Sequence, residues 1–359
     1  MKEMVRHCLP SEYRGDDSWF HRLNTFEQQE TRRQVAFKRI HWPELEDGFW
    51  SKRPSYQYPH ILPENHMAKA LYDPVAAQIL KYIKDEDVAL HTEALNLRSS
   101  QVCCFNVLSP LREDKELGRL VLKPLLPNVR AVDAIEFEYT GPYTTTEWLG
   151  EPPTGERGQN RTSIDATIWW KDSVENKCVT LVEWKYTERS FGSCGGYESD
   201  ANTTKRQCRV LDASAKHPET KCFLAYSNPP RRYWEHLAEA GIDRTKFEGF
   251  VGCPFRGPFY QLLRQSLLAA YLRHSHAADK VEVAVVSFDG NTSLLMCPPW
   301  LKSLVPGGTK STILDAWNAV TPAIPPVRHV TIQQIMEAVD LTLPQGHGWR
   351  LYIRERYGV

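Results

Sequence analysis

Two short segments, 163–170 and 179–186, constrain the fold of this 359-residue chain more than any other part of it. Each predicts a β-strand, because β-branched and aromatic residues fill it. The short polar segment between them, 171–177, suits the turn of an antiparallel hairpin. We therefore expect a two-stranded ribbon, and its register decides which side chains meet.

A hairpin centred on Val174 places Asp165 directly opposite Glu183, with the two Cβ atoms roughly 4.5–5.5 Å apart. Side chains of a strand alternate between its two faces, so Lys185 shares the face of Glu183. The same register gathers apolar side chains on the other face: Ile164, Ala166, Ile168, Trp170, Val182 and Trp184. One register thus predicts a charged face and a buried face.

Two carboxylates on adjacent strands repel each other unless a cation neutralises them. A hard ion such as Mg²⁺ binds carboxylate oxygens and keeps several waters, which leaves room for a phosphate oxygen. Such an ion lowers the pKa of a bound water and polarises the phosphoryl group. Lys185 can orient the attacking water or offset the charge that develops on the phosphate. The arrangement suits hydrolysis of a phosphodiester.

These residues resemble the motif of the PD-(D/E)XK nuclease superfamily. Asp165 matches the motif aspartate, Glu183 the second acidic ligand and Lys185 the catalytic lysine. The resemblance implies that Asp165, Glu183 and the Trp184 carbonyl bind Mg²⁺ or Mn²⁺. It also implies an α/β (α+β) fold with a restriction-endonuclease-like αβββαβ core, a central mixed sheet flanked by helices, and N-terminal and C-terminal elaborations.

Most of residues 56–290 is also similar to a bacterial group of predicted restriction endonucleases. The similar stretches are 97–101 with 104–106, 135–139, 183–188 and 260–265. This resemblance implies DNA as the substrate and a role in restriction or defence against phage. One departure concerns RecB-like relatives, which carry a tyrosine where Leu211 follows Gln207; its absence weakens the case for exonuclease processing.

The order of elements follows that family. Residues near 88–108 predict the first helix, 131–139 the first strand, 201–215 the second helix and 221–227 the following strand. Further helices are predicted over 26–39, 66–84 and 260–273, a strand over 280–289 and a long loop over 140–161. We therefore divide the chain into an N-terminal helical extension (1–87), a nuclease core (88–290) and a C-terminal appendage packed on that core (291–359).

Other side chains are secondary candidates. Glu138, on the first core strand, is expected on the side that bears Asp165, as a third acidic catalytic group. Lys205, Arg206, Gln207 and Arg209 are predicted to contact DNA phosphates without reading sequence. The alternative for each set is ordinary surface polarity: a solvated strand face for Glu138, surface charge for the basic cluster, and a cross-strand Glu–Lys pair for the catalytic residues themselves.

Nine cysteines occur without a C-x-x-C pair. Cys194, Cys208, Cys222 and Cys253 can in principle bind an iron–sulfur cluster, as in some relatives within the superfamily. We favour free thiols of the core, because unpaired cysteine behaves as a small buried residue.

The formal net charge is zero, so attraction to nucleic acid has to come from local patches. No apolar run approaches the ~20 residues of a membrane span. The odd number of cysteines and the lack of a signal peptide suggest the cytoplasm.

Double-strand cleavage by an enzyme with one active site often requires two copies of the enzyme. A homodimer is therefore one option for this chain, and partner proteins of a defence system are another.

The function predicted from these patterns is a Mg²⁺-dependent deoxyribonuclease, an endonuclease of bacterial restriction or anti-phage defence. Two alternatives remain. One is a catalytically silent nucleic-acid-binding module that keeps the nuclease fold, and the other is a ribonuclease that uses the same site.

Overall fold

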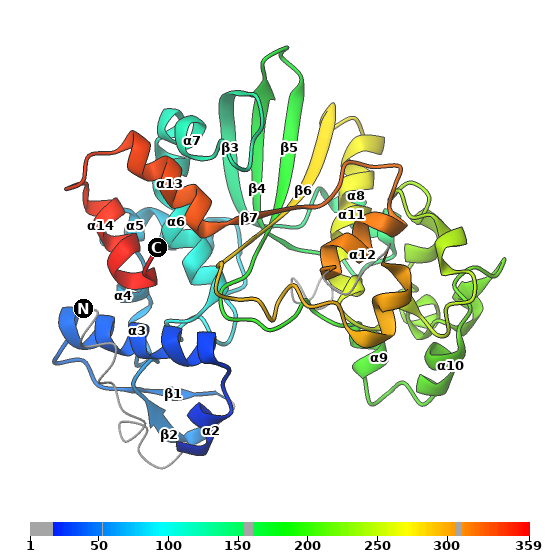
Figure 1. Cartoon of the computed structure of the whole chain (residues 1–359), viewed down its shortest axis with the longest axis horizontal. Coiled ribbons are helices and arrows are strands. Elements are labelled where there is room, and N and C mark those ends of the chain that lie inside the picture. Colours follow the sequence, from blue (N-terminus) through cyan, green and yellow to red (C-terminus); the bar gives the residue numbers. More distant parts are fainter. Residues whose placement is uncertain (1–16, 52, 154–160, 306–310) are drawn as a thin grey trace.

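The computed structural model describes residues 17–51, 53–153, 161–305 and 311–359. Its centre is a five-stranded sheet in the order β3-β4-β5-β6-β7, with helices around it (Figure 1). The strands are β3 (Val129–Tyr139), β4 (Ile164–Asp172), β5 (Lys177–Trp184), β6 (Lys280–Ser287) and β7 (Arg328–Thr331). Neighbours pair antiparallel from β3 to β5 and parallel from β5 to β7. This mixed sheet flanked by helices confirms the predicted fold class.

The β4–β5 hairpin has the predicted register. Ala166 pairs with Val182 and Lys171 with Lys177, so the ladder is centred on Val174. At the turn, the Asp172 carboxylate accepts the N–H groups of Val174 and Asn176, both at 3.0 Å. At the other end of the hairpin, this register brings Asp165 beside Glu183.

Both faces of the sheet are buried, which corrects the expectation of one charged face. On one face, Ile168, Val182 and Trp184 pack with side chains of α6 (Ser100–Glu113), α7 (Lys115–Val121) and α13 (Ile332–Thr342). On the other, Val179 and Leu181 pack with side chains of α8 (Tyr143–Leu149), α11 (Phe259–His274) and α12 (Ile313–Val320). Ile164, expected on the first face, belongs to this second cluster. The face that carries Glu183 is therefore polar only at its end.

A long connection joins β5 to β6, because two parallel strands need a crossover. Its last helix, α11, packs on the sheet and leads into β6, so the core runs α6-β3-β4-β5-α11-β6. The predicted helix 260–273 and strand 280–289 are thus confirmed in type and correspond to the second helix and the following strand of the core. β6 reads as a nearly continuous apolar run, as expected for a strand buried on both faces.

The part of this connection before α11 corrects two predictions. The helix predicted over 201–215 is only α10 (Lys205–Val210), and the segment predicted as a strand, 221–227, contains 3-10 helices instead. β6 already occupies the position beside β5, so no second strand can pair there. The other short elements are α9 (Gly195–Glu198) and the 3-10 helices η2 (Pro218–Lys221), η3 (Phe223–Tyr226), η4 (Tyr233–His236), η5 (Arg244–Phe247) and η6 (Pro254–Arg256).

The N-terminal part contains α2 (Asp17–His21), α3 (Thr25–His41), β1 (Gly48–Trp50), β2 (Arg53–Tyr58), α4 (Met67–Ala70) and α5 (Asp73–Asp85). The predicted helix 26–39 corresponds to α3, which begins with a capping box between Asn24 and Glu27. The predicted helix 66–84 is split into α4 and α5 at Leu71, shortly before Pro74. Residues near 88–108 are helical only from Ser100, where Ser99 caps α6.

The C-terminal part adds a strand as well as helices. Its elements are η7 (Pro299–Leu304), α12, β7, α13 and α14 (Gly348–Tyr357), and β7 forms the edge of the central sheet beside β6. α14 lies against α3, so the N-terminal and C-terminal parts of the described chain pack on each other (Figure 1). The predicted loop 140–161 contains α8, while residues 154–160 lie outside the described residues. Within the described ranges, none of the helices is long and apolar enough to cross a membrane.

Candidate active site

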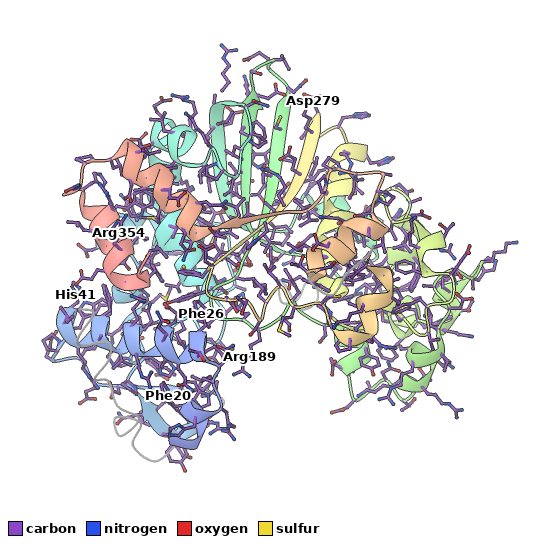
Figure 2. The ribbon with its side chains drawn as sticks, viewed as in Figure 1. Phe20, Phe26, His41, Arg189, Asp279 and Arg354 are labelled. Atoms are coloured by element: carbon purple, nitrogen blue, oxygen red, sulfur yellow. The ribbon has the colours of Figure 1, made fainter. Side chains whose placement is uncertain are left out.

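The predicted acids lie at the end of β5. β5 and β6 both begin next to Asp279, which is labelled in Figure 2. The Asp279 N–H donates to the carbonyl of Lys177, the first residue of β5, at 2.8 Å. The acids occupy the opposite end of these strands. Figure 2 also labels Arg189, shortly after β5, whose Nε donates to Glu27 of α3 at 2.7 Å. This contact ties the chain that leaves β5 to the N-terminal helix.

Glu183 is almost fully buried, with 1 % of its surface exposed. Its Oε1 lies 2.7 Å from Lys185 Nζ. Two glutamines of α11, Gln261 and Gln265, also donate to it, one to each carboxylate oxygen. They are four residues apart and therefore share one face of the helix. This buried carboxylate is consequently well supplied with donors, as a charge away from water has to be.

Asp165 approaches β5 from the start of β4. Its Oδ2 accepts the backbone N–H of Trp184 at 2.7 Å. Burial raises the pKa of Asp165 well above its usual range, and the nearby carboxylates of Glu183 and Glu138 raise it further. Lys185 and the Trp184 N–H act in the opposite direction. Burial and the two neighbouring carboxylates thus disfavour the charged form of Asp165.

Lys185 follows β5 directly, and its backbone N–H continues the parallel pairing by donating to the Val286 carbonyl at 2.8 Å. Burial lowers the pKa of Lys185, but the carboxylates of Glu183, Glu188 and Asp165 more than offset this effect and hold it above its usual value. The side chain is therefore an ammonium group at neutral pH. The structure brings Asp165, Glu183 and Lys185 together, as predicted.

Glu138 joins this group from the end of β3. It is buried, which excludes the alternative of a solvated strand face. Gln101 of α6 donates to its Oε1 at 2.7 Å and the Ser163 hydroxyl to its Oε2 at 2.8 Å. Its backbone has a φ of +50°, a left-handed conformation that costs a non-glycine residue of order 1–3 kcal/mol and that recurs at functional sites.

The acidic side chains suit a magnesium ion that keeps several waters, rather than an ion enclosed entirely by protein ligands. Among the described residues, no three His, Cys, Asp or Glu side chains form a group that could hold a metal ion. Mg²⁺ needs only one or two carboxylates, because it keeps several waters. Asp165 and Glu183 meet that requirement. The pKa of Asp165 is raised first by burial and then by the negative charge of Glu183 and Glu138, and a cation would offset that charge.

Comparison with known proteins agrees with this geometry. The family model described as "Restriction Endonuclease associating with ARP" matches residues 21–358. The chain belongs to this family. Neither a curated protein nor a solved structure matches it. Membership of a restriction endonuclease family indicates a nuclease, that is, a hydrolase that acts on nucleic acid.

Several residues that contact the acids of this site were not predicted from the sequence as site residues. Gln261 and Gln265 hold Glu183, while Gln101, Ser163 and His91 surround Glu138. A hydrogen bond to Glu138 raises the pKa of His91, although burial opposes it. The glutamines of α11 carried a signal: two amides four residues apart interrupt an apolar helix, and buried polar groups need partners.

The basic cluster lies elsewhere. Lys205, Arg206, Gln207 and Arg209 lie on α10, at the far side of the molecule from α3 and α14 (Figure 1). Arg206, Gln207 and Arg209 are exposed, and Arg209 Nε donates to the Tyr197 hydroxyl at 3.2 Å. None of the contacts of the described residues joins α10 to the carboxylates.

Proposed function

We propose that this protein is a metal-dependent endonuclease that hydrolyses DNA phosphodiester bonds in bacterial restriction or anti-phage defence. The observation that carries the proposal is the convergence of Asp165, Glu183 and Lys185 at one end of a restriction-endonuclease-like sheet. Family membership supports nuclease chemistry, and the paired carboxylates support dependence on Mg²⁺ or Mn²⁺.

Three groups of this chain would hold the ion: Asp165, Glu183 and the Trp184 carbonyl. The Trp184 N–H points to Asp165, whereas the Lys185 N–H points to β6. N–H and C=O of one strand residue face the same side, so we expect the Trp184 carbonyl on the side of Asp165. Each carboxylate oxygen accepts two bonds. Glu183 Oε1 already accepts from Lys185 and Gln261, whereas Oε2 accepts only from Gln265 and so keeps a position for a cation. When bound, the ion supplies Lewis acidity and a more acidic water.

Lys185 acts through its charge. Because its pKa stands above the ordinary value, the side chain is a poor general base at neutral pH. Its ammonium group can instead orient the attacking water and offset charge on the phosphate. Glu138 adds a third acid, which Gln101 and Ser163 hold in place, and we assign it a supporting catalytic role.

One experiment separates this function from its alternatives. Pure protein and its Asp165→Asn variant are incubated with closed circular DNA, linear DNA, single-stranded DNA and RNA, each with Mg²⁺ and with EDTA. We expect Mg²⁺-dependent cutting of closed circles by the wild type alone. Cutting of RNA alone would identify a ribonuclease, and binding without cutting would identify a silent binding module.

The remaining parts of the proposal have their own tests. Double-strand cleavage by two copies predicts a homodimer on DNA, which sedimentation of the complex measures. Phosphate contacts from Lys205, Arg206, Gln207 and Arg209 predict that the wild type binds DNA more tightly, and with a steeper salt dependence, than variants that lack these side chains. Each lost phosphate contact weakens binding and reduces the salt slope. Defence partners are tested by co-expression with neighbouring genes during phage challenge.

A further inference from the structure

A histidine in the segment between α5 and α6 faces the active site. His91 Nε2 lies 3.7 Å from Glu138 Oε1. The imidazole is 57 % exposed, whereas the Glu138 side chain is only 5 % exposed. Within the described residues, Nδ1 of this ring has no hydrogen-bond partner. One ring nitrogen thus faces a buried carboxylate, and the other is free to contact a substrate.

Hydrogen bonds fix the backbone around His91. Gln101 of α6, which is buried, accepts the His91 N–H through its Oε1 at 3.0 Å. Its Nε2 donates to the Ala89 carbonyl at 3.2 Å and to Glu138 Oε1 at 2.7 Å. The His91 carbonyl in turn accepts the N–H of Ala94, whose side chain is part of the core, at 2.8 Å. One buried amide therefore holds both members of the His91–Glu138 pair in place.

The charges around the ring favour its protonated form. The hydrogen bond to Glu138 raises the pKa of His91, as do the charges of Glu138 and Glu188, while burial and the charge of Lys185 lower it. The net shift is upward from the usual value of a histidine. An imidazolium whose pKa lies near neutral pH gives up its proton readily, as a general acid has to.

Hydrolysis of a phosphodiester calls for a proton donor at the leaving group. The sugar oxygen that leaves phosphorus is strongly basic, so a positioned acid lowers the barrier. Lys185 is a poor donor, because the neighbouring carboxylates hold its pKa above the ordinary value. Cys104 is buried, and burial raises the pKa of its thiol well above its usual range. His91 combines exposure with a proton that it can release.

We propose that His91 is a catalytic residue, the general acid that protonates the leaving sugar oxygen. The inference rests on the proposed hydrolysis of a phosphodiester. The oxygen of the attacking water bonds to phosphorus while the bond from phosphorus to the sugar oxygen breaks. The electron pair of the broken bond takes the Nδ1 proton of His91. The water loses a proton to solvent, and His91 regains its own from solvent. Glu138 orients the imidazole and stabilises its charged form.

The test changes the leaving group. A thiol is far more acidic than an alcohol, so a substrate with sulfur in place of the leaving oxygen needs no general acid. The position of the cut is first mapped with the wild type, and a DNA duplex is then made with sulfur at that bridging position. Rates with Mg²⁺ are measured on the oxygen and sulfur duplexes for the wild type, His91→Ala, Lys185→Met and His217→Ala. His217 is the matched control, because it is 63 % exposed and also contacts a glutamate, Glu219, but in the crossover.

On the oxygen duplex, His91→Ala should be slower than the wild type by about a hundredfold or more. On the sulfur duplex, this difference should shrink to less than about tenfold. Lys185→Met should be impaired on both duplexes and His217→Ala on neither. Because the His91 side chain is largely exposed, His91→Ala should keep the fold and the DNA affinity of the wild type, which circular dichroism and binding without Mg²⁺ measure.

Two results would overturn the general acid and leave the nuclease standing. One is full activity of His91→Ala on the oxygen duplex, and the other is an equal loss on both duplexes. A wild type that cuts no nucleic acid would overturn the proposed function together with this inference.

Discussion

The side chain of Asp165 takes the place of a backbone partner for Trp184, whose N–H it accepts at 2.7 Å. The regular β4–β5 ladder ends at Ala166 and Val182, directly before this contact. The carboxylate is thereby held beside the peptide that separates Glu183 from Lys185. One hydrogen bond thus ends the ladder and positions the first acid of the site.

Asp165→Asn separates these two roles. The amide keeps an oxygen for the Trp184 N–H but lacks the charge that binds a cation, so the fold should be retained. We expect DNA cleavage to fall by about a hundredfold or more, with no loss in the free energy of unfolding. Mg²⁺ should raise the melting temperature of the wild type but not of the variant. Full Mg²⁺-dependent activity in Asp165→Asn would refute the proposed metal site.

Lys185→Met removes the ammonium group that contacts Glu183 and leaves that carboxylate buried. We expect loss of cleavage and a decrease of about 3 kcal/mol in the free energy of unfolding, because an uncompensated buried charge is costly. The matched control is Lys185→Met combined with Glu183→Gln, which removes both charges. Urea unfolding should show the stability largely restored, while activity stays lost. Equal instability of the single and double variants would contradict a charge effect.

Gln265→Leu tests whether α11 positions the second acid. The change removes one donor from a buried carboxylate, which should lower stability by about 2 kcal/mol. With Glu183 less firmly held, cleavage should need more Mg²⁺, so a titration of activity against Mg²⁺ is the decisive measurement. Gln78→Leu, at an exposed position of α5, serves as the control. An unchanged Mg²⁺ requirement in Gln265→Leu would remove Gln265 from the site.

The features predicted best from the sequence are those that depend on the alternation of side chains along a strand. Asp165 and Glu183 meet because a period of two and a short turn determine the register around Val174. Prediction from the sequence was wrong where two segments compete for one position in the sheet. Residues 221–227 do not pair beside β5, because the more apolar β6 occupies that position. The contacts of Gln261 and Gln265 with Glu183 arise only from the path of the crossover, which no local pattern encodes.

The hairpin turn provides a test by pH. A bond from Lys280, 2.7 Å from Asp172 Oδ2, and further bonds from Asn176 hold the pKa of Asp172 well below its usual range. The folded state thus prefers the carboxylate, and its stabilising effect is present at neutral pH. It is lost as the pH falls below roughly 4, where the unfolded chain takes up the proton.

Asp172→Asn should therefore be less stable than the wild type at neutral pH, and the difference should shrink as the pH falls through that range. Lys280→Met should reproduce the effect, because it removes the largest cause of the low pKa. The double variant should add little to either single change, since both act on the same contact. Thermal unfolding across the pH range measures all three. A difference between wild type and Asp172→Asn that stays constant into acid would mean that the carboxylate charge does not stabilise the turn that sets the register of Asp165 and Glu183.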